Sequence, residues 1–227
     1  MRSELRRDLV SGDWIVVAPI RASHPSHIRK SVQRWVAPRG TCPFCHLEKY
    51  GNSEPLNYDS LQVVPNKFPV VAHKSVCPIL HTTGPYTVLE GIGQHEIVIT
   101  KDHRRNFAHL LSREAQMVFK VFQSRYRTLM NHPCTAYVSI FHNWGPGAGA
   151  SVYHPHYQII SIPVVPTNIS HSLLGSARYL RAHNKRCVHC TMIRWEEKYK
   201  RRIVYKNEGA IAYTPFVSRE PFELRVF

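Results

Sequence analysis

Acidic residues and long apolar runs are scarce in this sequence. Its 227 residues hold only 15 Asp and Glu against 30 Lys and Arg, which gives a formal net charge of +15. No apolar run approaches the roughly 20 residues that a membrane-spanning helix needs. Residues 1–8 also lack the apolar core of a signal peptide. We therefore expect the protein to reside in the cytoplasm.

The basic excess is spread over short clusters, such as residues 103–105 and 198–202, instead of one long tail. Such clusters could contact a nucleic-acid backbone. A solvated basic face explains them more simply, and a positive field also steers small anionic substrates towards a site. We therefore interpret the clusters as a solvated basic face, with nucleic-acid binding as the less favoured alternative.

Six cysteines divide into two Cys-x-x-Cys pairs and two single residues. The pairs are Cys42 with Cys45 and Cys187 with Cys190, and the single residues are Cys77 and Cys134. In a chain without a secretion signal, such pairs bind zinc more often than they form disulfides. The single residues are predicted to be buried apolar side chains.

A glycine-rich stretch followed by alternating polar residues occupies residues 143–160. Its glycines lack side chains, so that backbone N–H groups can approach an anion closely. His154, His156 and Gln158 then stand at alternate positions before an apolar run at 159–162. Period two predicts a strand with these three side chains on one face. Two imidazoles and an amide beside a phosphate-sized loop indicate phosphoryl transfer with a histidine nucleophile.

Other segments show strand and helix patterns. Residues 5–19 read as strand, turn and strand, and β-rich runs follow at 61–71, at 93–103 and at 135–141. Apolar residues at helical spacing predict a helix from about 113 to 130, with Ser112 as its N-cap. Its apolar stripe is expected to pack on the sheet.

The run from Asn143 to Gln158 resembles the active-site segment of galactose-1-phosphate uridylyltransferases, a branch of the histidine-triad superfamily. These transferases carry His-Pro-His-x-Gln, where the hydrolase branch carries a third histidine. Gln158 at the third position therefore indicates transfer of a nucleotidyl group and not its hydrolysis. The resemblance implies an α/β fold, with a histidine-triad-like antiparallel half-barrel sheet, packing helices and the start of a second similar half.

The resemblance also implies the roles of the site residues. His156 would be the nucleophile that forms a nucleotidyl-histidine, and Gln158 would hold a phosphate oxygen. A structural zinc would be bound by Cys42, Cys45, His103 and His154. Substrate contacts would come from Arg21, Asn66, Asn143, Gly149, Ala150 and Ser151. A second arginine of the family pattern is replaced here by His24.

The chain partly repeats itself. Cys42-Pro43-Phe44-Cys45 has a counterpart in Cys187-Val188-His189-Cys190, and residues 95–99 correspond to 222–226. The counterpart of His103 would fall beyond Phe227. We therefore interpret the sequence as a truncated transferase, with residues 1–165 as the half that bears the zinc site and nucleophile. Residues 166–227 would be a linker helix and an incomplete second half, in which Cys187 and Cys190 are candidates for a second metal site.

The expected activity is transfer of a nucleotidyl group from UDP-glucose to a hexose 1-phosphate, in galactose metabolism. The resemblance implies a homodimer for family members of full length. An ADP-glucose phosphorylase-type adenylyltransferase is the alternative, because paired cysteines in both halves resemble that branch somewhat more. A zinc-bearing, basic nucleic-acid-binding module is the alternative of another class, and an inactive remnant that keeps only the fold is a third.

Overall fold

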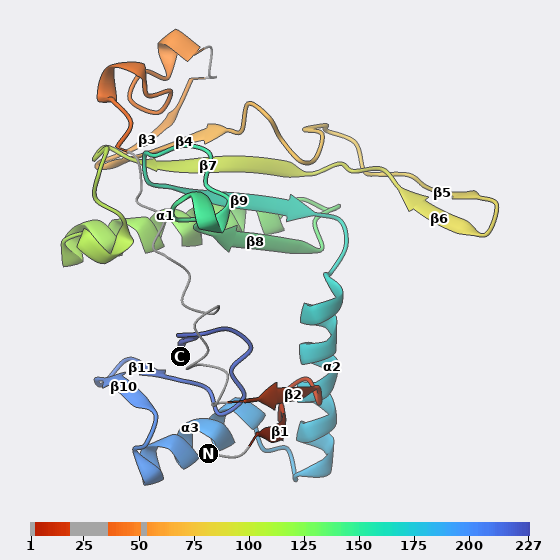
Figure 1. Cartoon of the computed structure of the whole chain (residues 1–227). Helices are drawn as coiled ribbons and strands as arrows, with labels where there is room; N and C mark the ends of the chain where they lie inside the picture. The colour runs from red at the N-terminus through yellow and green to blue at the C-terminus, as the bar shows by residue number, and fades with distance from the viewer. Residues whose placement is uncertain (1–2, 19–35, 51–53) are drawn as a thin grey trace. The chain divides into compact units, whose positions relative to one another are not determined.

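The computed structural model describes residues 3–18, 36–50 and 54–227 (Figure 1). The predicted phosphate contact Arg21 and its neighbour His24 lie outside these residues. The chain divides into two compact units, one within residues 31–165 and one that combines residues 1–30 with 166–227. The described residues 3–18 thus belong to the unit formed by the C-terminal part, whereas the sequence analysis grouped them with the first half. The assignment of two repeat halves stays a prediction.

A five-stranded antiparallel sheet forms the centre of the first unit. Its strand order is β3-β4-β7-β9-β8, so that the central strand β7 lies between β4, which precedes it in the chain, and β9, which follows it. The strands are β3 (Leu56–Tyr58), β4 (Leu61–Pro65), β7 (Gln94–Thr100), β8 (Tyr137–Phe141) and β9 (His156–Ile162). This mixed α/β architecture with antiparallel sheets confirms the predicted fold class.

Helix α1 (Ser112–Met130) covers one face of this sheet (Figure 1). Its buried residues Val118, Val121 and Leu129 pack against strand residues that include Val98 and Ile159. The predicted helix is therefore confirmed. Its predicted apolar stripe is confirmed in part, since Val118 and Leu129 are buried whereas Phe119 and Tyr126 are 59% and 44% exposed. The N-cap is Leu111 and not Ser112, because the Glu114 carboxylate reaches back to accept a hydrogen bond from the Leu111 N–H at 2.7 Å.

The opposite face of the sheet carries the cysteine turn. Leu47, Val64, Ile97 and Ile99 form a second buried cluster there, with Phe44 packed against it. In the β7–β9 register, Ile97 stands opposite Gln158 and Ile99 opposite His156. Directly opposite residues share a face, so His156 and Gln158 lie on the side of the cysteine turn, away from α1.

Strand β9 begins at His156, and His154 and Pro155 precede it. The predicted strand is therefore wrong at its first two positions. Strand β4 likewise ends at Pro65, and the following Asn66 N–H donates to the carbonyl oxygen of His95 at 2.7 Å. Proline has no N–H to donate to a ladder, so both strand limits coincide with prolines.

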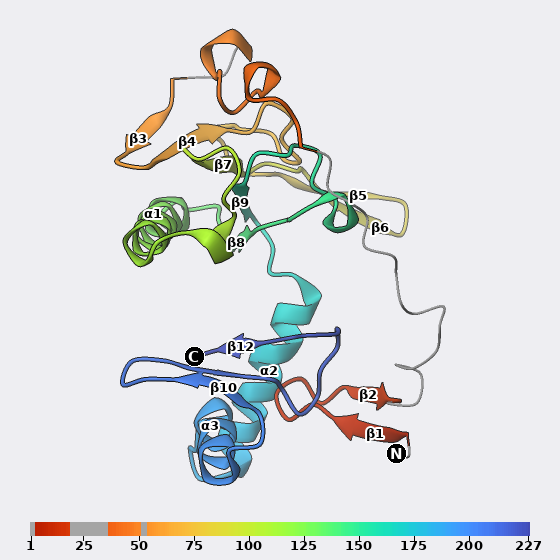
Figure 2. The same ribbon diagram turned by 60° about the vertical axis from the view of Figure 1, so that its left-hand side comes forward.

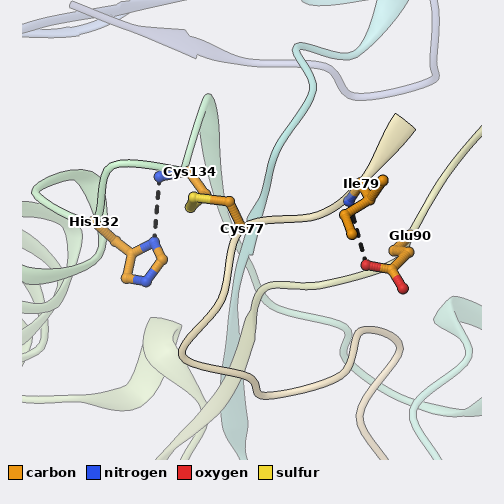
Figure 3. Close-up of a disulfide and its surroundings, with 5 residues drawn as sticks. All are labelled: Cys77, Ile79, Glu90, His132 and Cys134. Carbon is orange, nitrogen blue, oxygen red and sulfur yellow. Dashed lines mark hydrogen bonds between the residues drawn. A yellow bond between two sulfur atoms is a disulfide. The ribbon is translucent and has the colours of Figure 1, made fainter. Parts of the chain in front are cut away.

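A disulfide joins Cys77 to Cys134 (Figure 3). It connects the segment before the hairpin of β5 (Leu80–Thr83) and β6 (Tyr86–Leu89) to the turn after α1. The imidazole of His132 accepts a hydrogen bond from the Cys134 N–H at 3.3 Å. The prediction of two unpaired buried cysteines is therefore wrong, because the fold brings together residues 57 positions apart.

The second unit pairs β1 (Glu4–Arg7) with β2 (Trp14–Val17), which confirms the predicted strand, turn and strand. Helices α2 (Thr167–Ala182) and α3 (Val188–Tyr199) precede a three-stranded sheet (Figure 2). Its strands are β10 (Ile203–Lys206), β11 (Ile211–Tyr213) and β12 (Arg225–Val226). A Cβ at Gly175 would lie 1.7 Å from the Val10 carbonyl oxygen, so only glycine lets α2 approach the β1–β2 turn this closely.

Short 3-10 helices occur at Arg39–Thr41, Glu48–Tyr50, Phe107–His109 and Pro146–Ala148. Within the described parts of the chain, every helix is too short or too polar to pass through a bilayer.

Candidate active site and metal centre

Two thiols and two imidazoles converge on the face of the sheet opposite α1. Cys42 and Cys45 come from the turn after residues 39–41, His103 follows β7, and His154 precedes β9. Their ligand atoms all lie within 4.8 Å of one another. We call these four residues the metal cluster. The sequence analysis predicted that they converge, and the fold brings them together from three separate segments.

Four of the six distances between ligand atoms in the metal cluster match the edges of a tetrahedron around an ion. The two imidazole Nδ1 atoms are 3.3 Å apart, Cys45 Sγ lies 3.4 Å from each of them, and Cys42 Sγ lies 3.5 Å from the His154 Nδ1. Zn–N bonds of about 2.0–2.1 Å and Zn–S bonds of about 2.3 Å give tetrahedral edges of about 3.3–3.6 Å. The donor set and its spacing therefore fit zinc.

The outer nitrogens of both imidazoles are held by backbone carbonyls. His103 Nε2 donates to the Ala37 oxygen at 2.8 Å, and His154 Nε2 donates to the Thr100 oxygen at 2.6 Å. A carbonyl can only accept, so Nε2 carries the proton in each ring and the Nδ1 lone pair faces the cluster. Burial lowers the pKa of His154 to about 4, and it raises the pKa of the Cys45 thiol. His154 is therefore neutral at neutral pH, and a metal would displace a thiol proton.

An ion-pair network fixes the turn that presents His103. The Asp102 carboxylate accepts hydrogen bonds from the backbone N–H groups of Arg104 and Arg105 and from the Arg105 guanidinium. That guanidinium also binds Glu114 of α1. Burial acts to raise the pKa of Asp102, yet these donors hold it well below its usual range. Asp102 is therefore an anion that ties the turn to the helix.

His156 lies beside the metal cluster but is not one of its members. Its Nδ1 donates to the carbonyl oxygen of His154 at 2.8 Å, so the lone pair of the neutral ring is on Nε2. The residue is only 7% exposed, and the Phe44 ring meets it edge-on with centroids 4.9 Å apart. A nucleophile is expected to be open to its substrate, whereas Phe44 of the Cys-Pro-Phe-Cys turn packs over His156 in this structure.

Gln158 and Asn66 both contact a third residue, His95. Gln158 Oε1 lies 2.9 Å from His95 Nε2. The Asn66 amide nitrogen lies 3.3 Å from Nδ1 and 3.0 Å from Nε2 of the same ring, while its Oδ1 accepts from the Phe68 N–H. The sequence analysis did not assign a role to His95. Its alternation with Ile97 and Ile99 in β7 was the available signal, since residues two apart in a strand share a face.

The glycine loop, residues 143–155, connects β8 to β9 and contains Asn143 and Ser151. Gly145 and Gly149 have φ of 80° and 78°, a conformation that suits residues without a Cβ. The N–H groups of Gly149 and Ala150 donate to the carbonyl oxygens of Pro146 and Gly145. These two predicted phosphate donors are thus engaged within the loop itself, and their role towards a phosphate stays a prediction.

The second cysteine pair is exposed at the start of α3. Cys187 is the N-cap residue, and its Sγ accepts from the Cys190 N–H at 3.4 Å. Among the described residues, no third histidine, cysteine or carboxylate converges with this pair as in the metal cluster. The histidines nearest to this pair in sequence contact aromatic rings: His183 stacks on Tyr179, and His189 lies against Phe227. A second metal site therefore stays a prediction, with Cys187 and Cys190 as its candidate ligands.

Comparison with known proteins identifies the family. The sequence model described as galactose-1-phosphate uridyl transferase, N-terminal domain, matches residues 1–166. An ADP-glucose phosphorylase of Arabidopsis thaliana is 28% identical over 97% of this chain and 64% of its own length. A galactose-1-phosphate uridylyltransferase of Thermotoga maritima is also 28% identical, over 99% of this chain and 66% of its own.

Solved structures share the fold. A crystal structure of an ADP-glucose phosphorylase from Arabidopsis thaliana with bound ADP-glucose has a TM-score of 0.78 at 24% identity and covers 100% of this chain and 68% of that one. A structure described as a uridylyltransferase has a TM-score of 0.71 at 27% identity and covers 99% and 65%.

The family match extends over most of the chain, which itself spans 64–66% of the length of these curated relatives. The matched residues include the metal cluster, His156 and Gln158. This chain belongs to the galactose-1-phosphate uridyl transferase family.

Proposed function

We propose that the protein transfers a nucleotidyl group through a covalent intermediate on His156. The observation that carries this proposal is the hydrogen bond from His156 Nδ1 to the His154 carbonyl, which leaves the lone pair on Nε2. A neutral imidazole with a fixed tautomer is the form that attacks phosphorus. Because His154 belongs to the metal cluster, the nucleophile is anchored two residues from a rigid point.

The reaction has two balanced steps. The Nε2 lone pair attacks the α-phosphorus of a nucleoside diphosphate sugar, an N–P bond forms, and the P–O bond to the departing sugar 1-phosphate breaks. A phosphate oxygen of a second sugar 1-phosphate then attacks the same phosphorus, and the N–P bond breaks. Gln158 would donate an amide N–H to a non-bridging oxygen, where charge builds up. As an amide it has no basic nitrogen with which to activate water.

Other residues have supporting roles in this proposal. Zinc in the metal cluster would supply structural rigidity, with all four positions taken by protein ligands and none open to substrate. Asn66, Asn143 and Ser151 would contact the nucleotide, together with the backbone at Gly149 and Ala150 and with Arg21, which lies outside the described residues. Since His156 is 7% exposed, its neighbours, Phe44 among them, must move aside when substrate binds.

The proposed substrates are UDP-glucose and a hexose 1-phosphate, after the relatives named galactose-1-phosphate uridylyltransferase. ADP-glucose with inorganic phosphate is the second candidate, because a relative named ADP-glucose phosphorylase is equally similar at 28% identity. Homodimer formation and residence in the cytoplasm belong to the same proposal, by likeness to the family.

Trapping the intermediate tests the proposal. Protein is mixed with UDP-glucose or ADP-glucose labelled in the nucleoside, quenched in alkaline detergent, and counted for label bound to the chain. We expect stoichiometric label from one nucleotide, none in His156→Ala, and full label in a control variant, His81→Ala, which alters an exposed residue of β5. Label that persists in His156→Ala would refute the covalent role. Salt-dependent DNA or RNA binding without labelling would favour the nucleic-acid alternative.

A further inference from the structure

His95 is a buried histidine that contacts the proposed phosphate-holding amide and takes no part in the metal cluster. It is 2% exposed and lies in β7, on the same face as Ile97 and Ile99. In the β7–β9 register, Ile97 stands opposite Gln158, so His95 is a diagonal neighbour of Gln158 across the two strands. This relation places its ring against the Gln158 amide.

The tautomer of His95 follows from its neighbours. The backbone N–H of Val70 donates to Nδ1 at 3.3 Å, and a backbone N–H can only donate. Nδ1 therefore carries the lone pair and Nε2 carries the proton. Burial, opposed by the hydrogen bond with Gln158, lowers the pKa of His95, so the ring is neutral. The Asn66 amide nitrogen lies 3.3 Å from Nδ1 and 3.0 Å from Nε2 of the same ring. An atom this close to both ring nitrogens lies over the face of the ring and not along the N–H or lone pair of either, so this contact does not set the tautomer. The Asn66 oxygen accepts from the Phe68 N–H.

The backbone of His95 is fixed as well. Its N–H donates to His73 Nε2 at 2.8 Å, and its carbonyl oxygen accepts from the Asn66 N–H at 2.7 Å. The ring therefore cannot turn to offer its other nitrogen without losing the bond from Val70. An N–H at Nε2 requires an acceptor, and Gln158 Oε1 at 2.9 Å supplies it.

We propose that His95 is a positioning residue that sets which way round the Gln158 amide lies. This inference rests on the proposed function, because it assigns the amide nitrogen to the phosphate. With Oε1 bound to His95, the Gln158 N–H groups point away from β7. Among the hydrogen bonds between described side chains, Gln158 takes part through Oε1 and not through its amide nitrogen. A reversed amide would set two N–H groups against each other and turn an oxygen towards the phosphate anion, which repels it.

The first test reads the orientation without any turnover. In protein labelled with ¹⁵N-histidine, the resonances lost in His95→Gln identify His95. We expect its Nδ1 to be unprotonated and its Nε2 to be protonated, in the full chain at neutral pH. A ring protonated on Nδ1, or on both nitrogens, would overturn the proposal even if the enzyme is active.

The second test is a double-mutant cycle on the rate of His156 labelling. We expect His95→Phe, which keeps a flat ring but removes the donor, to slow labelling about tenfold, the equivalent of one hydrogen bond. His95→Gln, which keeps a donor, should recover most of that rate. In a Gln158→Ala background the same His95→Phe change should cost less than about twofold. An equal loss in both backgrounds would show that His95 acts on something other than Gln158.

The two tests separate this inference from the proposed function. Absence of label in the wild-type chain with every nucleotide sugar would count against the proposed function. The NMR measurement of the His95 tautomer would still test the orientation of the Gln158 amide, because it needs no turnover. His81→Phe, on exposed β5, is the matched control and should leave the labelling rate unchanged. Thermal unfolding of each variant separates misfolded chains from folded ones with a slow reaction.

Discussion

Removal of one cysteine from the metal cluster should release the metal and lower the melting temperature of the chain. Cys45→Ala is the sharpest change, because Cys45 is half-buried whereas Cys42 is buried at 3% exposure. Replacement of Cys45 by alanine therefore loses less packing than replacement of Cys42 would, so loss of the metal dominates the change in melting temperature.

The size of the shift in melting temperature follows from the linkage between metal binding and folding. A metal present at 100 to 1,000 times its dissociation constant stabilises the folded state by about 3–4 kcal/mol. For a domain of the size of residues 31–165, each kcal/mol shifts the melting temperature by about 3–4 °C. Cys45→Ala should therefore melt about 10–15 °C below the wild-type chain, since the turn at 42–45, His103 and His154 are no longer joined.

The assay pairs metal analysis by mass spectrometry with thermal unfolding followed by circular dichroism. Wild-type protein should carry one zinc in this site, and treatment with a chelator should bring its melting temperature to that of Cys45→Ala. The matched control is Cys187→Ala, in a Cys-x-x-Cys pair for which no third ligand converges among the described residues. Retention of the metal by Cys45→Ala would refute the assignment of the ligands. Loss of the metal with no change in melting temperature would refute its structural role.

Three further outcomes are expected. Gln158→His should raise hydrolysis of the labelled intermediate at least about tenfold in the absence of a sugar phosphate, because an imidazole can act as a base towards water; unchanged hydrolysis would contradict the role given to the amide. Cys134→Ser should lower the stability by up to about 4 kcal/mol, the chain-entropy value for a loop closed over 57 positions, and thermal unfolding of the variant should no longer respond to a reducing agent. Hydrogen bonds from Arg105 lower the pKa of Glu114 below its ordinary 4.5. The ionised carboxylate therefore stabilises the folded state fully above pH 4.5, and this stabilisation is lost as the pH falls through the lowered pKa. Glu114→Gln should therefore show a shallower loss of melting temperature under acid, and an unchanged slope would contradict this.

The local pattern of the sequence was sufficient for much of the site. The spacing Cys-x-x-Cys and the resemblance around His154 and His156 predicted a ligand set whose four atoms converge in the fold. The 3.6-residue period predicted α1, and alternation predicted β7 and most of β9. These features depend on the order of neighbouring residues, which the sequence states directly.

Contacts between distant segments were decided by the tertiary structure alone. The bond between Cys77 and Cys134, the Phe44 ring over His156 and the His95–Gln158 pair each join residues far apart in the chain. Strand order and register determine such contacts, and neither is written in the local pattern because a strand can pair with any other of suitable length. The sequence by itself thus determined which chemical groups the site holds. The order β3-β4-β7-β9-β8 decided which of them touch, since it places β7 beside β9 and therefore His95 against Gln158.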